Sequence, residues 1–305
     1  MHRIAALALV LAGAHLAHAD DAAIPDHTVD KAIDGPIIVG ALAGSVLPIA
    51  IPMRTHALWD TQILGDLDTG AYDNFSPRAA KISDAALGLT IAAPLVYLTG
   101  STVDDADGDR LVLYGETLAI DLALVQLAKY AVQRPRPYLY NHSAAARAYA
   151  RAAGDDAYLS FYSSHAAMGF GASVAGAYLL SASGKASGGS RALVWGGGLA
   201  AATFTAGLRV RAGKHFFSDV AIGAIVGTIV GYAVPALHSD NPYVPSAADV
   251  GLGAAGILVG ALAANLVPLG HVHEGDVSTS TWHDRFTLAP MAVRGGSGLA
   301  LVGRL

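Results

Sequence analysis

The sequence predicts an all-α protein whose helices form a membrane-embedded bundle. Hydrophobic residues make up 53% of the 305 residues and charged residues only 14%, against roughly 25% charged residues in soluble domains. The apolar residues gather into seven segments, separated by polar, acidic or glycine- and serine-rich joints. These segments cover residues 36–53, 85–100, 111–132, 166–183, 191–208, 219–237 and 247–269. A soluble helical protein rich in alanine and glycine is the alternative interpretation.

The start of the chain carries a predicted export signal. A basic start precedes an apolar run from Ile4 to Leu11, and Ala17-His18-Ala19 supplies the small-residue pattern of a cleavage site. We expect a signal peptide over residues 1–19 and a polar N-terminal segment over residues 20–35. An uncleaved anchor helix is the alternative, and the shortness of the apolar run favours cleavage.

The apolar segments predict about six core helices. Several segments are slightly shorter than the roughly 20 residues that cross a bilayer. The segment over residues 111–132 carries Glu116 and Asp121, which have to face protein or water. Three segments contain glycines four residues apart, a spacing that lets helices approach closely. These pairs are Gly40 and Gly44, Gly227 and Gly231, and Gly256 and Gly260.

The region after residue 240 differs from the bundle. A proline-containing stretch closes the sixth apolar segment, so residues 241–305 are expected to form a C-terminal extension with one apolar helix. Two alternating runs, from Phe286 and from Leu299, flank a glycine-rich turn and predict a β-hairpin. Among the joints, residues 141–160 are expected to form a loop and residues 181–191 a flexible linker.

Composition excludes several classes of function. The net charge of −5 and the lack of a basic tract exclude a nucleic-acid binder. The chain has no cysteine, which excludes disulfides, thiolate catalysis and cysteine-based zinc sites. Gly251-Leu-Gly253-Ala-Ala-Gly256 resembles a nucleotide fingerprint but lacks the preceding strand, so helix packing is favoured. His271-Val-His273-Glu274 lacks further metal ligands. We expect no cofactor and no metal.

Three segments that carry basic residues, a histidine or both stand out in a chain so poor in charge. They cover residues 129–137, 162–165 and 209–219. In the last of them, His215 and Asp219 would share a face if the segment is helical. A carboxylate behind an imidazole fixes its tautomer and raises its basicity, as a nucleophilic histidine requires. A His–Asp pair that only caps a helix explains this segment equally well.

The other two segments also have plain structural explanations when taken alone. Ser163 and Ser164 precede an apolar run, where serine is a preferred helix cap and the helix end attracts anions. His165 at that position can give a proton to a leaving oxygen. Lys129 and Arg136 end a helix candidate, as basic residues commonly do, although arginine also grips phosphate oxygens with paired donors.

Together the three segments resemble the type 2 phosphatidic acid phosphatase family, which shares its core with bacterial class A acid phosphatases and vanadium haloperoxidases. The family pattern is K-x6-RP, then PSGH, then SR-x5-H-x3-D. The chain matches it with the spacing inside the first and third parts intact, over roughly residues 85–237. We therefore expect a phosphatase core over residues 36–240. The matching residues are Lys129, Arg136, Pro137, Ser163, His165, Arg209, His215 and Asp219.

The resemblance implies a mechanism without a metal. His215 would attack phosphorus and form a phosphohistidine, and Asp219 would orient it. His165 would protonate the leaving alcohol and then activate water. Phosphoryl transfer depends mostly on positioning and on neutralising oxygen charge. The phosphate oxygens would be held by Lys129, Arg136, Ser163, Ser164 and Arg209.

Three positions depart from the family pattern. Tyr162 replaces proline, Ser164 replaces glycine and Leu208 replaces serine. None of these changes removes a charged group or an imidazole. Ser164 keeps the backbone N–H that would meet phosphate, while its side chain narrows the pocket.

The expected protein is a cell-envelope phosphatase acting on a phosphorylated lipid or a small phosphomonoester. A vanadate-dependent haloperoxidase and a non-catalytic phosphate-binding or structural membrane protein are the alternatives. Export combined with three early crossings would turn the site towards the cytoplasm, whereas the family works on the outer side. We therefore expect the segment over residues 36–53, interrupted by prolines, not to cross, leaving the site facing the periplasm. A soluble periplasmic form is the alternative.

Overall fold

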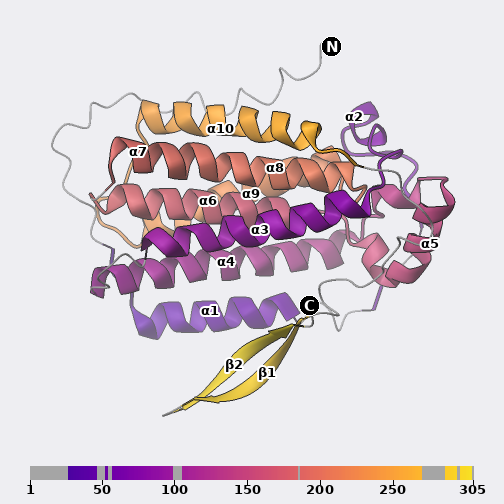
Figure 1. Ribbon diagram of the computed structural model, residues 1–305. Coiled ribbons are helices and arrows are strands. Elements are labelled where there is room, and N and C mark those ends of the chain that lie inside the picture. Colours follow the sequence, from indigo (N-terminus) through magenta and orange to yellow (C-terminus); the bar gives the residue numbers. More distant parts are fainter. Residues whose placement is uncertain are drawn as a thin grey trace.

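The computed structural model shows a bundle of long helices lying side by side (Figure 1). It describes residues 27–46, 52–53, 57–98, 105–184, 186–269, 286–293 and 296–303. The expected signal peptide and the motif over residues 271–274 lie outside these ranges. The predicted helical bundle is confirmed. Its long helices are α1 (Lys31–Val46), α3 (Pro77–Leu98), α4 (Asp105–Val132), α6 (Ser164–Ala182), α8 (Gly198–Arg211), α9 (Phe217–Leu237) and α10 (Ala247–Leu266).

Short helical elements complete the chain and gather partly at one end of the bundle, where α2 and α5 lie (Figure 1). They are α2 (Asp66–Thr69), η3 (Pro137–Leu139), α5 (Ala144–Ala153), η4 (Gly154–Tyr158), α7 (Gly188–Arg191) and the π-helical η5 (Ala192–Gly197). The C-terminal region carries β1 (Phe286–Val293) and β2 (Gly296–Gly303), paired antiparallel with Phe286 opposite Gly303.

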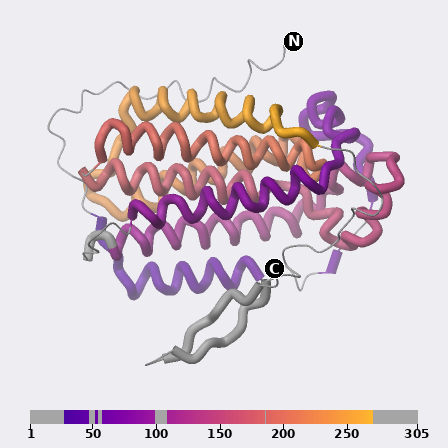
Figure 2. Tube along the Cα trace, in the orientation of Figure 1, coloured from indigo at the N-terminus to yellow at the C-terminus, as the bar shows by residue number. Residues whose placement is uncertain are grey.

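The central helix of the bundle is α6, which runs through its middle (Figure 2). It is buried along almost its whole length and contacts α3, α4, α8 and α9. Its sequence is made mostly of alanine, glycine and serine, so neighbouring helices can come close on every side. Phe170 and Val174 pack against Trp195 in the main apolar cluster. The fold therefore holds the first turn of α6 rigidly at one end of the bundle.

Glycine contacts bring α9 against α6 and α10 against its neighbours. A Cβ atom on Gly227 would lie 2.1 Å from the Ala167 carbonyl oxygen, and one on Gly256 would lie 2.1 Å from the Gly196 carbonyl oxygen. Two of the three predicted close-packing pairs thus pack as expected. The third does not, because Gly40 has nothing within 4 Å of such an atom and Gly44 meets only Ala123 at 4.0 Å.

Within the described ranges, four helices are long and apolar enough to cross a membrane, and they indicate an integral membrane protein. They cover Pro77–Leu98, Gly108–Leu139, Phe217–Leu237 and Ala247–Leu266. The helix α1, which overlaps the segment expected not to cross, is not among them. The helix α10 packs against α8, although it follows the expected boundary at residue 240.

Two expectations about local structure are wrong. Residues 141–160 were expected to form a loop but contain α5 and η4. The Ser143 hydroxyl accepts a hydrogen bond from the Ala146 amide at the start of α5, and Tyr149 is buried on its inner face. Because Arg147 and Arg151 interrupt its apolar residues, this amphipathic helix forms no continuous apolar run in the sequence. In addition, α1 begins at Lys31 and runs through Pro36, so the expected polar N-terminal segment ends inside a helix.

Candidate active site

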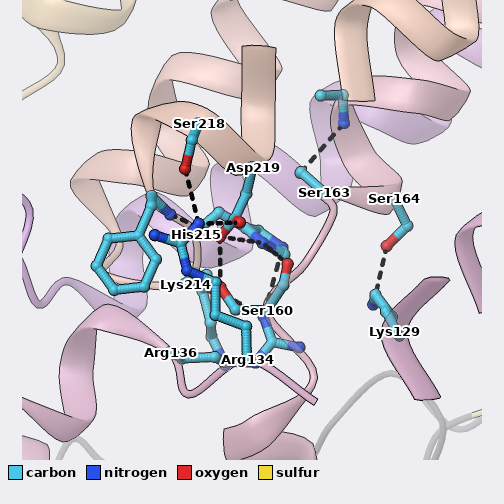
Figure 3. A network of polar contacts seen from close by, with 12 residues as sticks. Lys129, Arg134, Arg136, Ser160, Ser163, Ser164, Lys214, His215, Ser218 and Asp219 are labelled. Atoms are coloured by element: carbon cyan, nitrogen blue, oxygen red, sulfur yellow. Dashed lines mark hydrogen bonds and ion pairs between the residues drawn. The ribbon is translucent and has the colours of Figure 1, made fainter. Parts of the chain in front are cut away.

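The expected site residues lie at or beside helix ends. Figure 3 shows Lys129, Arg136, Ser163, Ser164, His215 and Asp219 in one region. Lys129 lies in the last turn of α4, and Arg136 follows it in an extended stretch. Ser164 and His165 form the first turn of α6, with Ser163 as its N-cap. Arg209 lies in the last turn of α8, His215 precedes α9, and Asp219 lies in the first turn of α9. Helix ends from four different elements therefore converge.

The two nitrogens of His215 have different surroundings. Nδ1 lies 2.8 Å from the backbone oxygen of Ser160. A carbonyl oxygen only accepts, so Nδ1 carries the proton and Nε2 carries the lone pair. Nε2 lies 3.3 Å from Nη1 of Arg136. The nucleophilic nitrogen of a neutral imidazole thus faces a guanidinium group.

Asp219 holds His215 in position mainly through Ser160 and Phe216, and less by contacting the imidazole directly. Its Oδ2 lies 3.8 Å from Nδ1 of His215, beyond hydrogen-bond distance. The same oxygen accepts from the Ser160 hydroxyl at 2.6 Å and from the Phe216 amide at 2.9 Å. The expected shared helix face does not form, because α9 begins at Phe217 and leaves His215 outside it.

Arg134 is a buried support that sequence reasoning did not assign to the site. Its side chain is fully buried and donates to Asp219 at 2.6 Å, to Asp68 at 2.9 Å and to Gln62 at 2.7 Å. It also lies over the Phe216 ring, 3.9 Å from the centroid. Breaking a buried pair of this kind is costly because it leaves an unpaired charge. Arg134 therefore fixes Asp219.

Arg136 is held in place by two neighbouring segments. It donates to the Asp156 backbone oxygen at 2.8 Å, to the Asp156 carboxylate at 2.9 Å and to the Lys214 backbone oxygen at 2.9 Å. Burial alone would raise the pKa of Asp156, but the charge of Arg136 holds it below the ordinary value. The guanidinium is thus oriented before any ligand binds. No signal in the sequence marked Asp156 for this role.

Asp84, on α3, links two of the expected phosphate-handling residues. Its Oδ1 lies 2.8 Å from Nε2 of His165 and 3.0 Å from Nη1 of Arg209. The Asp84 side chain is 42% exposed, whereas those of His165 and Arg209 are each 8% exposed. Nδ1 of His165 is buried and makes no hydrogen bond to any part of the chain that the structure describes. A carboxylate therefore engages the two residues that would otherwise meet an anion.

The start of α6 supplies hydroxyl groups to the same region. The Ser163 hydroxyl accepts from the Ala166 amide at 3.3 Å, and the Ser163 amide donates to the Asp219 backbone oxygen at 3.1 Å. The Lys129 ammonium donates to the Ser164 hydroxyl at 3.3 Å. The serine that replaces glycine in the family pattern thus contacts a cation that would hold phosphate.

The other two departures from the family pattern fill the protein interior. Tyr162 is buried beside Val125 and Ala167, and Leu208 is buried beside Ala79. Leu208 has no polar group to offer, and within the described residues the Tyr162 side chain makes no hydrogen bond to the catalytic candidates. Of the three departures, the change at Ser164 is therefore the one that alters the site chemically.

A turn at Gly213 sets the direction of the two residues that follow it, Lys214 and His215. Gly213 has a φ of 72°, and a Cβ atom there would lie 2.1 Å from the Asn74 backbone oxygen. Only glycine accepts this left-handed, crowded position. The turn points the Lys214 ammonium at Tyr149, where it contacts the hydroxyl and lies 4.2 Å from the ring centroid.

The site carries an excess of buried positive charge. Burial, followed by the charges of Arg136 and Arg209, places the pKa of His215 well below its ordinary value. Burial and Arg209 lower the pKa of His165 to about 4, although Asp84 opposes this shift. Burial and Arg136 lower the pKa of Lys214 to about 7. Such a site is built to receive an anion.

Fold and site together describe a helical bundle with candidate membrane-spanning helices and a buried cluster of cations and histidines at their ends. Residues 110–243 match the PAP2 superfamily model, so the chain contains a PAP2 superfamily domain and the resemblance is confirmed. The match includes every site residue chosen from the sequence, whereas Gln62, Asp68 and Asp84 precede it. No match was found among curated proteins or among solved structures.

Proposed function

We propose that this protein is a cell-envelope phosphatase that forms a phosphohistidine on His215. Membership of a superfamily composed mostly of phosphatases supports this class of activity. The observation that carries the mechanism is the pair of contacts made by His215. Its Nδ1 is occupied by the Ser160 carbonyl, and its Nε2 faces Arg136. A phosphate held by Arg136 would meet the lone pair of a neutral nucleophile.

In the first step, Nε2 of His215 attacks phosphorus. A bond forms between nitrogen and phosphorus, the bond from phosphorus to the leaving oxygen breaks, and His165 gives that oxygen a proton. Developing charge on His215 is stabilised by Asp219, whose carboxylate lies 3.8 Å away.

In the second step, His165 takes a proton from water. The water oxygen attacks phosphorus, the nitrogen–phosphorus bond breaks, and inorganic phosphate leaves with His215 restored. The residue that acted as an acid in the first step thus acts as a base in the second, as microscopic reversibility requires.

Protein cations would neutralise the phosphate oxygens, so the reaction we propose is metal-independent. After burial, the charges of Arg136, Arg209 and Lys129 lower the pKa of His215, so these three cations lie near its imidazole. Ser163 and the backbone N–H of Ser164 add donors at the N-terminus of α6, where the helix dipole favours an anion. Positioning and charge neutralisation are what phosphoryl transfer mainly needs.

A lipid phosphate or lipid-linked pyrophosphate is the substrate class we favour. The site lies at the end of a bundle that contains four candidate membrane-spanning helices. A lipid could lie along the bundle with its headgroup at the site. We place the site on the periplasmic side. Small phosphomonoesters are the alternative substrates, and they would suit a soluble form.

Activity of the purified protein tests this proposal. Wild-type protein in detergent should release inorganic phosphate from a short-chain phosphatidic acid, and His215→Ala should reduce the rate by at least about 10³-fold. His142→Ala, which removes an exposed histidine, should leave the rate unchanged. Activity that survives in His215→Ala excludes the phosphohistidine mechanism, and phosphate binding without turnover by the wild type supports a non-catalytic protein.

Trapping the intermediate provides a second test. In His165→Asn, an aryl phosphate whose leaving group needs no protonation should still phosphorylate His215, while water activation is lost. A phosphoryl group should then accumulate on His215, stable in alkali and labile in acid, and mass spectrometry should locate it. A phosphoryl group on any other residue contradicts the mechanism.

A further inference from the structure

A second cluster of ionisable side chains lies towards the other end of the bundle. It joins Asp34 on α1, Glu116 on α4 and His238, which follows α9. Nε2 of His238 lies 3.2 Å from Oδ1 of Asp34 and 3.8 Å from Oε2 of Glu116. Glu116 precedes Lys129 by 13 positions on the same helix, or about 20 Å at 1.5 Å per residue. The cluster is therefore separate from the candidate active site.

The hydrogen bonds of His238 direct a lone pair at the two carboxylates. Its Nδ1 lies 2.7 Å from the Val234 backbone oxygen, which only accepts, so Nδ1 carries a proton. In the neutral imidazole, Nε2 is then an acceptor facing two groups that are also acceptors. Either a proton, on Nε2 or on one of the carboxyl groups, or a bound cation has to lie between them.

The carboxylates have unused oxygens. Oδ2 of Asp34 and Oε2 of Glu116 are buried and have no hydrogen-bond partner among the residues that the structure describes. Both residues are only 2% exposed. Unpartnered buried carboxylate oxygens are costly unless something else satisfies them. One proton on His238 could serve only one of them well, whereas a cation could serve both.

We propose that Asp34, Glu116 and His238 bind a divalent transition-metal ion, with Zn²⁺ as the best fit. All three ligand atoms lie within 4.8 Å of one another. A tetrahedral Zn²⁺ with bonds of roughly 2.0–2.2 Å holds its ligand atoms about 3.3–3.5 Å apart, so movements of under about 1 Å close the site. The Val234 carbonyl supplies the outer hydrogen bond that a metal-bound histidine usually makes.

A neighbouring cavity leaves the fourth coordination position accessible. The cavity has a volume of about 330 Å³ and is lined by Asp34, His238 and the polar residues Asp30 and Asp240 among others. A water molecule could complete the coordination, and the ion could reach the site from this cavity. The ion would tie α1, at the edge of the bundle (Figure 1), to α4 and to the end of α9.

Metal binding by the full-length protein in detergent tests the proposal. Chelator-treated protein should bind about one Zn²⁺ per chain in titration calorimetry, and Zn²⁺ should raise the unfolding temperature because it binds only the folded state. Co²⁺ in its place should give visible absorption bands typical of tetrahedral nitrogen and oxygen coordination. Glu116→Gln and Asp34→Asn should each weaken Zn²⁺ binding by about 10-fold or more. Asp240→Asn, which changes an exposed cavity residue, should bind Zn²⁺ like the wild type.

Three outcomes would overturn the proposal. The first is that Zn²⁺ does not bind stoichiometrically. The second is that Glu116→Gln binds Zn²⁺ as tightly as the wild type does. The third is that the Co²⁺ spectrum is that of an octahedral, loosely held ion. The first would leave a protonated His238 bridging the carboxylates. If Glu116→Gln fails to fold, Glu116→Asp, which keeps the charge but retracts it, should bind Zn²⁺ more weakly and show altered Co²⁺ bands. Phosphatase activity is not the readout, so the two proposals can fail independently.

Discussion

The contacts of single nitrogens define the chemistry of this site. His215 presents Nε2 because a backbone carbonyl occupies its other nitrogen. His165 presents Nδ1 because Asp84 occupies Nε2. Asp84 also accepts a hydrogen bond from Arg209. An incoming phosphate would therefore compete with this half-exposed carboxylate for the same cations.

This arrangement predicts opposing effects of Asp84→Asn on binding and turnover. Removing the carboxylate charge frees Arg209 and makes the site more positive, so the inhibition constant of inorganic phosphate should fall by about ten-fold, or roughly 1.4 kcal/mol. The same change removes the partner that stabilises protonated His165, so kcat should fall by about ten-fold. Steady-state kinetics with phosphate as competitive inhibitor measures both.

Two variants control this prediction. Asp84→Glu keeps the charge and should preserve most of the wild-type behaviour, and Asp73→Asn changes another acidic residue and should have no effect. Weaker phosphate inhibition in Asp84→Asn would show that Asp84 supports the anion site instead of competing with the anion.

The pKa values at the site predict faster reaction at mildly acid pH. The pKa of His215 lies well below its ordinary value, so this residue stays neutral and nucleophilic as the pH falls. His165, with a pKa of about 4, becomes increasingly protonated over the same range. Above pH 7, Lys214 loses its proton, because its pKa is about 7, and the site loses positive charge. We expect kcat/KM to be about ten-fold or more higher at pH 5.5 than at pH 8.

A pH profile of kcat/KM checks this expectation. The residual activity of His165→Asn towards an aryl phosphate should lose most of the acid enhancement, because the titrating acid is gone. A wild-type optimum above pH 8 would contradict the assigned roles of both histidines.

At the residue scale, the sequence predicted the groups with distinctive chemistry and missed their supports. Lys129, His165 and His215 belong to spaced motifs, so they could be found without a structure. Asp84 and Asp156 could not, because each is an ordinary acidic residue that long-range folding brings to its partner. The Ser160 carbonyl was equally invisible, since every residue has one.

At the scale of helices, close glycine contacts hold the site together. The first turns of α6 and α9 carry His165 and Asp219, and these helices meet where a Cβ atom on Gly223 would lie 2.6 Å from the Ser163 backbone oxygen. One turn further, Gly227 meets Ala167 in the same way. Packing between backbones therefore fixes His165, the proposed proton donor, relative to Asp219, the proposed support of His215.

Gly227→Ala should destabilise the protein although it adds only one methyl group. The new Cβ atom would lie 2.1 Å from a backbone oxygen, so α9 would have to move away from α6. We expect a loss of about 1–3 kcal/mol in the free energy of unfolding, measured by thermal or denaturant unfolding in detergent.

Gly251→Ala on α10 is the matched control. A Cβ atom there has nothing within 4 Å, and alanine is the better helix former by about 1 kcal/mol. This variant should be as stable as the wild type or more stable. Equal stability of the two variants would show that the contact at Gly227 relaxes without cost.

The positions of the helices were largely predictable from the sequence, but the faces on which they contact one another were less so. Every long helix of the described chain overlaps a predicted apolar segment, because burial and lipid both demand long apolar stretches. The predicted start is late for α3, which begins at Pro77, and early for α8, which begins at Gly198. The spacing of glycines predicted two close contacts but failed for Gly40 and Gly44, because spacing does not say which face meets a neighbour. The helix α5 was missed because the arginines on its exposed face interrupt its apolar residues, so it contains no continuous apolar run.

At the scale of the whole molecule, the two proposed sites lie towards opposite ends of the bundle. The candidate active site surrounds the start of α9, and the proposed metal site includes the residue just after its end. Because α9 is one of the candidate membrane-spanning helices, the two ends should face opposite sides of the membrane. Sequence alone could not reveal this polarity, since Asp34, Glu116 and His238 share no motif.

The absence of cysteine allows a direct test of this polarity. Single substitutions His142→Cys, near the active-site end, and Asp240→Cys, at the other end, both fall on exposed residues. With the site facing the periplasm, a membrane-impermeant thiol reagent should label the first variant in intact spheroplasts. It should label the second only after the membrane is permeabilised, because the bilayer separates the two ends. The cysteine-free wild type gives the background, and retained phosphatase activity shows that each variant is folded. The reverse labelling pattern would turn the active site towards the cytoplasm, and equal labelling of both positions in intact spheroplasts would show that α9 does not cross.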